Sequence, residues 1–177
     1  MPDYIRARTQ GGTYFFTVVT AQRQPILTQP DVLVALRAAI KTTQNTHPFT
    51  IEAWVVLPDH MHAIWTLPTD DTQYSIRWSM IKRYVAKECR HLALPPNASQ
   101  QKRREIAFWQ RRFWEHQIRD QADYQRHIDY VHVNPVKHQW VSQPRDWPYS
   151  TFHRLVKSGV YSEDWAENTE FSDDFGE

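Results

Sequence analysis

The sequence predicts an α+β fold, a ferredoxin-like βαββαβ sandwich in which an antiparallel sheet carries its helices on one face. Two observations lead to this expectation. The predicted elements follow the order strand, helix, strand, strand, helix, strand. The middle two strands form a predicted hairpin, which pairs them antiparallel. A further C-terminal helix and an acidic tail are expected after the last strand.

The first strand and the first helix precede the hairpin. Residues Thr13 to Thr20 are rich in β-branched and aromatic side chains, which is typical of a strand. Residues 28–45 predict a helix, because Pro30 and Asp31 suit a first helical turn and leucine and isoleucine recur at helical spacing.

Residues Phe49 to Leu67 predict the hairpin, with Pro58-Asp59 as its turn. The second strand is expected to run from His60 to Leu67. In the first strand, we expect one face to hold Phe49, Ile51, Ala53 and Val55 and the other face to hold Thr50, Glu52 and Trp54.

The next predicted element is a basic helix from Tyr74 to Leu92, followed by a loop from Ala93 to Glu105. Its apolar stripe consists of Trp78, Ile81, Val85, Cys89 and Leu92. Its outer face is expected to carry Arg77, Lys82, Arg83, Lys87 and Arg90.

A last strand and a last helix complete the prediction. Residues Phe108 to Ile118 are aromatic-rich and strand-like. Asp120 and Asp123 resemble a capping pair that opens the helix. The helix should end near Asn134, because the following Pro135 disfavours helical geometry in the residue before it.

Length and composition bound the class of protein. The 177 residues suit one domain over residues 1–161 and a tail over residues 162–177. Hydrophobic residues make up 41% of the chain, too many for a disordered protein. The single cysteine, Cys89, excludes an internal disulfide and a paired-cysteine zinc motif. Because we find no signal segment and no run of about 20 apolar residues, we expect a cytoplasmic protein.

Charge is divided unevenly along the chain. The tail holds seven of the 20 acidic residues and no Lys or Arg, so residues 1–161 carry 21 basic and 13 acidic residues, a formal charge of +8. A basic body suits a polyanion such as nucleic acid, and an acidic tail could shield that surface. Charge alone favours the simpler interpretation of a solvated surface with a disordered end.

The stretch "LPDHMHAIWTL" places two histidines, His60 and His62, on a predicted strand. Side chains two residues apart on a strand point to the same face, with Cα atoms roughly 7 Å apart, so the two imidazoles can converge on one ion. Met61, Ala63 and Trp65 would then face the core. Taken alone, the pair is equally compatible with two hydrogen-bonded structural histidines.

A second group of polar residues lies on the last predicted helix. Tyr130 and Asn134 are four residues apart and share a face, which differs from the stripe of Tyr124, Ile128 and Val131. A phenol and an amide oxygen could therefore approach the same metal-bound phosphate. The alternative is an ordinary amphipathic helix whose tyrosine hydrogen-bonds at the surface.

Four separated motifs, "VVLPDHMHAIWTLP", "FWQRRFWEH", "HIDYVHVNPVKH" and "DWPYSTFHR", resemble the single-tyrosine HUH transposases. The similarity is strongest to the REP-associated tyrosine transposases of bacteria and extends from about Gly11 to Trp165. The resemblance implies a single HUH transposase-like domain, and the ferredoxin-like fold of that family agrees with the predicted order of elements.

The resemblance also implies roles for individual residues. His60 and His62 would be the two metal-binding histidines, and Tyr130 the nucleophile. Asn134 would be the third metal ligand, where related transposases use a glutamine. The expected ion is Mg²⁺ or Mn²⁺, although imidazole ligands alone would suit Zn²⁺ better.

The implied reaction is metal-dependent cleavage and rejoining of single-stranded DNA at REP-type hairpins through a covalent 5′-phosphotyrosine. The expected DNA-binding residues are Lys82, Arg83, Lys87, Arg111 and Arg112, together with the Lys102-Arg103-Arg104 cluster. The partner is single-stranded DNA, with a hairpin and a short flanking tag, and the protein should be a monomer or a weak dimer without a membrane partner.

Two alternatives remain open from the sequence. One is a zinc-dependent hydrolase in which His60, His62 and a third histidine such as His132 bind Zn²⁺ and activate water. The other is a catalytically inactive module that binds DNA hairpins through its basic surface.

Overall fold

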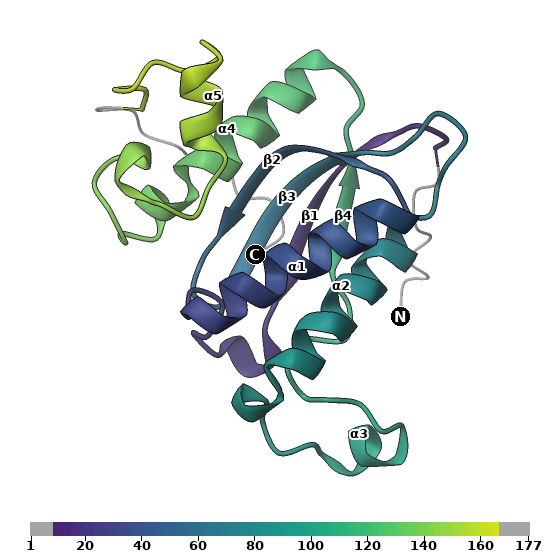
Figure 1. The fold of residues 1–177 in the computed structure, drawn as a ribbon. Helices are drawn as coiled ribbons and strands as arrows, with labels where there is room; N and C mark the ends of the chain where they lie inside the picture. Colours follow the sequence, from purple (N-terminus) through teal and green to yellow (C-terminus); the bar gives the residue numbers. More distant parts are fainter. Residues whose placement is uncertain (1–8, 167–177) are drawn as a thin grey trace, which may run out of the picture.

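The fold is a four-stranded antiparallel sheet with helices on both faces (Figure 1). The computed structural model describes residues 9–166, so residues 167–177 of the expected acidic tail lie outside it. The strands are β1 (Thr13–Val19), β2 (Thr50–Val56), β3 (His60–Thr66) and β4 (Trp114–Gln117), arranged in the order β2-β3-β1-β4. All three strand pairs are antiparallel, which confirms the predicted ferredoxin-like sheet.

Two long helices, α1 (Pro30–Thr46) and α2 (Tyr74–Glu88), pack side by side on one face of the sheet (Figure 1). The main core lies beneath them and includes Phe16, Met61 and Trp65 from the strands. Trp65 stacks on Trp78 of α2, with ring centroids 4.2 Å apart. The prediction that helices pack on this face of the sheet is therefore confirmed. The odd-numbered residues of β3, Met61, Ala63 and Trp65, point toward these two helices.

The opposite face of the sheet is covered by α4 (Gln121–Lys137). A smaller core fills the space between α4 and the sheet, built from Phe15, Val55 and Ile64 on the strands and Ile128 and Val131 on the helix. The even-numbered residues of β3, which include His60, His62 and Ile64, therefore point toward α4.

Short elements connect and brace these layers. They are three 3₁₀ turns, η1 (Ala21–Arg23), η2 (Arg90–Leu92) and η3 (Pro144–Asp146), and two short helices, α3 (Ala98–Lys102) and α5 (Phe152–Lys157). The segment before α5 runs along the outer edge of β2, where Val56 N donates to Tyr149 O and Thr151 N donates to Trp54 O. Because this segment covers the edge strand, β2 is not open to pairing with another chain.

A β-bulge in β2 overturns the predicted alternation of that strand. Glu52 is the extra residue, because Ile51 pairs with Trp65 while Ala53 already pairs with Ile64. One inserted residue reverses the facing of everything beyond it. Phe49 and Ile51 therefore pack in the α1–α2 core, Ala53 and Val55 pack beneath α4, and Trp54, predicted among the polar residues, is buried on the α1 side.

The last helix continues past the predicted end at Asn134. Pro135 lies inside α4, which runs to Lys137. The helical turn persists because the carbonyls of Asn134 and Pro135 still accept hydrogen bonds, from His138 N and Trp140 N, both at 3.0 Å. Proline removes one donor, but its fixed φ is compatible with a helix. This extension adds one helical turn beyond Asn134.

Three further predictions for the middle of the chain need correction. The ladder of β4 begins only at Trp114, because the preceding stretch makes just an isolated bridge to the end of β1, between Trp109 and Thr20, and the carbonyls of Gln110 and Arg111 accept hydrogen bonds from Lys82 Nζ. The predicted loop from Ala93 to Glu105 contains the helix α3. Arg77, predicted on the outer face, is fully buried and donates to the carbonyls of His47 and Pro48 and to the Asp71 carboxylate.

No helix within residues 9–166 combines the length and the apolar character that crossing a bilayer requires.

His132 joins α4 to the C-terminal segment. Its Nδ1 is 2.8 Å from Ile128 O and its Nε2 is 2.8 Å from Thr151 Oγ1. Burial lowers the pKa of His132 to about 3, from an ordinary value of 6.5, because a charged imidazole would lose its hydration there. Burial also lowers the pKa of His127 on the same helix.

We predict that acid weakens the fold between about pH 6.5 and pH 3. A lowered folded-state pKa means that the unfolded chain binds more protons in this window, so the free energy of unfolding falls as the pH falls. In urea titrations at several pH values, His132→Gln should show a smaller loss than the wild type, with a remaining loss from His127. His91→Gln, at an exposed histidine, should match the wild type. Equal pH dependence in His132→Gln and the wild type would contradict this assignment.

Candidate active site

The two histidines of β3 lie side by side beneath α4. His60 is 2% exposed and His62 is fully buried, and their ring centroids are 5.0 Å apart. The residues between and after them, Met61 and Ala63, pack in the opposite core. The strand period therefore places both imidazoles on one face, as the spacing predicts.

Each imidazole is oriented through its Nδ1 atom. His60 Nδ1 is 2.7 Å from Asp59 Oδ1, and His62 Nδ1 is 2.9 Å from Thr17 Oγ1 on β1. In both rings Nε2 is then the nitrogen that would bind an ion, with the Nδ1 partner fixing the ring. His60 Nε2 is buried and has no hydrogen-bond partner within residues 9–166. The pair is arranged as metal ligands are usually arranged.

Asp59 supports this arrangement as an ionised group. Burial alone would raise the pKa of its carboxyl, but the hydrogen bonds and charges of His60 and Arg23 hold that pKa at about 2. Arg23 Nη1 donates to Asp59 Oδ2 at 3.0 Å. The carboxylate is therefore negatively charged near neutral pH and favours a cation near His60.

Helix α4 brings Tyr130 to the same place. Its ring centroid is 5.3 Å from that of His62, and the side chain is 2% exposed. Phe15 lies beneath both rings, stacked on His62 at 5.3 Å and edge-on to Tyr130 at 6.0 Å. The expectation that Tyr130 lies on a different face from Ile128 and Val131 is wrong, because α4 buries a wide arc that includes all three.

Asn134 occupies the next turn of the same helix face. It is fully buried, and it lies between Tyr130 and His138 at intervals of four residues. Tyr130 contacts His62, and the His138 ring is 5.1 Å from the ring of His60. Asn134 is therefore on the side of α4 from which Tyr130 and His138 contact the histidine pair.

Lys137 is a site residue that the sequence analysis missed. Its Nζ donates a hydrogen bond to Tyr130 Oη at 3.2 Å and lies 4.8 Å from the centre of the tyrosine ring. The two residues are seven apart, which is two turns of helix and therefore the same face. This spacing would have revealed the contact if the helix had not been expected to end at Asn134.

A second polar cluster, His116–Asp123–His127, joins β4 to α4. His116 Nε2 is 2.8 Å from Asp123 Oδ2, and the two imidazoles stack with centroids 4.5 Å apart. The ligand atoms of the three residues all lie within 4.8 Å of one another, a spacing that could hold a metal ion. His127 also lies 4.9 Å from Phe15, so the cluster borders the first site. The sequence analysis did not identify it.

The Asp123 carboxylate of this cluster is already well supplied with donors. It accepts from Arg119 N at 3.0 Å and Arg126 Nη2 at 3.2 Å, besides its contact with His116. Burial would raise the pKa of Asp123, but these hydrogen bonds and the neighbouring histidines hold it well below its usual range. Because two arginines already neutralise this carboxylate, the cluster is better suited to fastening α4 to β4 than to binding a cation.

His132 is not placed to bind a metal ion together with His60 and His62. Both of its nitrogens are engaged, with Ile128 O and Thr151 Oγ1, on the side of α4 that faces α5. The zinc-hydrolase alternative therefore loses the third histidine that the sequence had suggested.

The expected DNA-binding residues lie outside the buried site. Arg83, Lys87, Arg111 and Arg112 are exposed, and Lys82 is half-buried. Lys82 and the arginine pair meet, because Lys82 Nζ donates to Arg111 O. Gln110 N donates to Val19 O, and Val19 pairs with His60, so this basic stretch approaches the end of the sheet where the histidines lie.

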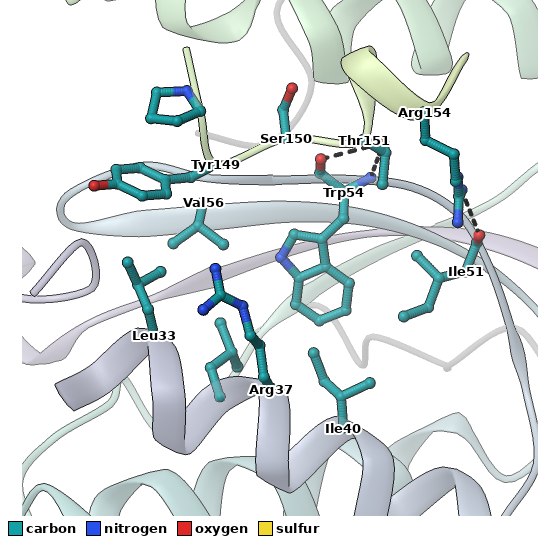
Figure 2. Close-up of a pocket in the computed structure, with 12 residues that line it drawn as sticks. Leu33, Arg37, Ile40, Ile51, Trp54, Val56, Tyr149, Ser150, Thr151 and Arg154 are labelled. Carbon is teal, nitrogen blue, oxygen red and sulfur yellow. Dashed lines mark hydrogen bonds between the residues drawn. The ribbon is translucent and has the colours of Figure 1, made fainter. Parts of the chain in front are cut away.

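The cleft drawn in Figure 2 is separate from the histidines. It has a volume of about 300 Å³ between α1, β2 and the segment before α5. Figure 2 shows Trp54 and Val56 pointing into it, with Arg37 and Arg154 at its sides. Trp54 and Val56 belong to the core on the α1 side, so the sheet lies between this cleft and the histidine pair.

Comparison with known proteins shows the family to which the chain belongs. Residues 9–134 match the IS200-like transposase family. A REP-associated tyrosine transposase of Escherichia coli K12 is 46% identical over 175 residues, 97% of this chain and 96% of the relative. A protein of Haemophilus influenzae, provisionally named as a REP-associated tyrosine transposase, is 46% identical over 173 residues, 95% of each chain.

A solved structure is similar to this chain in both sequence and fold. It is a REP-associated tyrosine transposase bound to a REP hairpin, and it matches with a TM-score of 0.82 and 46% identity over 97% of this chain and 96% of that one. With a family match over most of its length and a relative of this identity, the chain belongs to the IS200-like transposases and is a REP-associated tyrosine transposase.

Proposed function

We propose that this transposase cleaves and rejoins single-stranded DNA at REP-type hairpins, with Tyr130 as the nucleophile. The observation that carries the proposal is the meeting of His60, His62 and Tyr130, which come from β3 and α4 and have ring centroids 5.0 and 5.3 Å apart. The REP hairpin bound by the matching structure supports the choice of substrate.

The donor set at the site fits a divalent cation. His60 and His62 would hold the ion through Nε2, and Asn134 would add its amide oxygen. The buried His60 Nε2, with no hydrogen-bond partner in residues 9–166, is the observation that favours an ion there. When bound, a divalent cation would withdraw charge from a nonbridging oxygen of the phosphate. We propose Mg²⁺ or Mn²⁺, and two imidazoles favour Mn²⁺ of these.

The chain's own residues account for the attack. Tyr130 Oη would form a bond to phosphorus while the bond from phosphorus to the 3′ oxygen breaks, leaving a 5′-phosphotyrosine and a 3′-hydroxyl. A phenol is a weak nucleophile at neutral pH, with an ordinary pKa near 10 in model compounds. The Lys137 ammonium, 3.2 Å from Oη, favours the phenolate by charge and by hydrogen bonding.

The reaction is reversible in this scheme. The phosphotyrosine keeps the energy of the phosphodiester bond, so a 3′-hydroxyl can attack it and restore a DNA strand. The exposed cations Arg83, Lys87, Arg111 and Arg112, with Lys82, would hold the DNA backbone outside the site. A short flanking tag beside the hairpin would supply the unpaired phosphate.

We predict that wild-type protein with Mn²⁺ and a labelled single-stranded REP hairpin forms a protein–DNA adduct that survives denaturation. Tyr130→Phe should abolish the adduct, because it removes the attacking oxygen. Tyr124→Phe, a half-buried tyrosine on the same helix, should leave it intact. Gel electrophoresis in detergent measures the adduct. Strand cleavage that persists in Tyr130→Phe would favour a hydrolase instead.

We predict one tight Mn²⁺ site, at His60 and His62. Electron paramagnetic resonance of free Mn²⁺ should give one bound ion per chain, and His62→Ala should weaken its affinity by at least tenfold. His116→Ala tests the second cluster and should leave the affinity unchanged, because its carboxylate is already paired with arginines. The opposite result, in which His116→Ala loses the ion and His62→Ala keeps it, would place the metal in the His116–Asp123–His127 cluster and contradict this mechanism.

We predict that Lys137→Met lowers kcat of strand cleavage about tenfold and leaves the KM for DNA within twofold. The charge acts on the attacking oxygen and not on distant parts of the substrate. Lys137→Arg, which keeps a cation that can reach Oη, should recover much of the rate. Equal losses in the methionine and arginine variants, or a loss confined to KM, would show that Lys137 acts through packing or DNA affinity.

A further inference from the structure

A cavity of about 310 Å³ opens beside His60. Three separate segments of the chain form its walls: the stretch after β1, the turn between β2 and β3, and the end of α4. The lining residues are Arg23, Pro25, Pro58, Asp59, His60, His138 and Trp140. The cavity therefore shares His60 with the proposed metal site and continues outward from it.

Hydrogen bonds join the stretch after β1 to the hairpin turn, which are two of the three walls of this cavity. Thr20 donates to Asp59 O from both N and Oγ1 at 2.9 Å, and Leu27 N donates to Pro58 O at 2.8 Å. These contacts fix the segment that carries Arg23 against the hairpin turn. Two of the three walls are thus fixed relative to each other before any ligand binds.

Trp140 is placed by an unusual helix end. Its N donates to Pro135 O at 3.0 Å, which requires Gln139 to adopt a left-handed conformation with φ of 59°. That position is usually glycine, because other side chains are strained there. Arg23 is also left-handed, with φ of 53°. The left-handed conformation of Gln139 thus sets the position of Trp140, and that of Arg23 sets the direction of its own side chain.

Those two side chains offer complementary contacts. Trp140 is 53% exposed, unlike the buried tryptophans of the core, so its ring is accessible to an aromatic ligand. Arg23 Nη1 donates to Asp59 Oδ2, and the side chain is 45% exposed, so its guanidinium, which has five N–H donors, is accessible to a ligand. An exposed indole binds a nucleobase by stacking, and a guanidinium binds a phosphate.

We propose that this cavity is the subsite for the unpaired nucleotide that adjoins the cleaved phosphate. The base stacks on Trp140, and Arg23 contacts the backbone phosphate next to it. The volume lies at the lower end of the roughly 300–1,000 Å³ of small-molecule sites and suits one nucleotide. The inference rests on the proposed function, because His60 links the cavity to the reacting phosphate.

The test uses Tyr130→Phe protein, so that DNA binding is measured without cleavage. A REP hairpin with a single-stranded flank carries 2-aminopurine at one flank position at a time. At one position, emission should fall at least threefold on binding. Adding Trp140→Ala should restore that emission and raise Kd about tenfold, while Trp140→Phe, which keeps a ring, should restore it only in part. Val34→Ala, exposed on α1 at the other face of the sheet, is the control and should change neither quantity.

Arg23 is tested by the salt dependence of binding. Arg23→Gln should reduce the slope of log Kd against log salt concentration by about 1, since one phosphate contact is lost. An unchanged slope would remove the phosphate contact from the proposal. Trp114, 36% exposed on β4 across β1 from His62, provides the competing location for the base.

The outcomes separate this inference from the proposed function. The subsite would be overturned if Trp114→Ala abolished the quenching of 2-aminopurine while Trp140→Ala left it unchanged. It would also be overturned if Trp140→Ala changed the emission at no flank position. If wild-type protein forms no adduct but Trp140 still quenches one position, the nuclease proposal fails and the nucleotide site stands. If the adduct forms and no quenching depends on Trp140, only the subsite fails.

Discussion

The packing of α4 against the sheet, opposite α1 and α2, is the constraint on which the rest of the site depends. His60 and His62 are on a strand, and Tyr130 is on a helix almost 70 residues further along the chain, so only this packing brings them together. Phe15 lies between the helix and the strands and contacts His62 and Tyr130. Tyr130, the proposed nucleophile, is buried in the same small core that holds α4 in place. A change that loosens this core would therefore also disturb the geometry of the site.

Contacts at both ends of α4 restrict how far Tyr130 can move. At the start, Asp120 caps the helix and Asp123 binds His116 of β4. Near the end, His132 is tied through Thr151 to the segment that covers β2. In the proposed reaction, Tyr130 would need little reorganisation before attack, and enzymes gain much of their rate from such positioning. The second histidine cluster is therefore understandable as a structural support without a metal.

Local sequence patterns predicted the hairpin, the order of elements and the common face of His60 and His62, because strand and helix periods are properties of a few neighbouring residues. They could not reveal the bulge at Glu52, which depends on pairing with Trp65, or the burial of Arg77, whose carbonyl partners belong to His47 and Pro48. Lys137, His138 and Trp140 were missed because a local rule at Pro135 ended the helix too early, whereas the tertiary packing of α4 continues it.

We propose that the β3 histidines, and not the His116–Asp123–His127 cluster, hold the cation that faces Tyr130. The most direct measurement is anomalous diffraction from crystals of the protein with hairpin DNA and Mn²⁺. We expect one manganese peak at roughly 2.0–2.3 Å from His60 Nε2 and His62 Nε2, with Tyr130 Oη directed at the adjoining phosphate. A peak at His116, Asp123 and His127 instead, or a phosphate bound out of reach of Tyr130 Oη, would contradict the account.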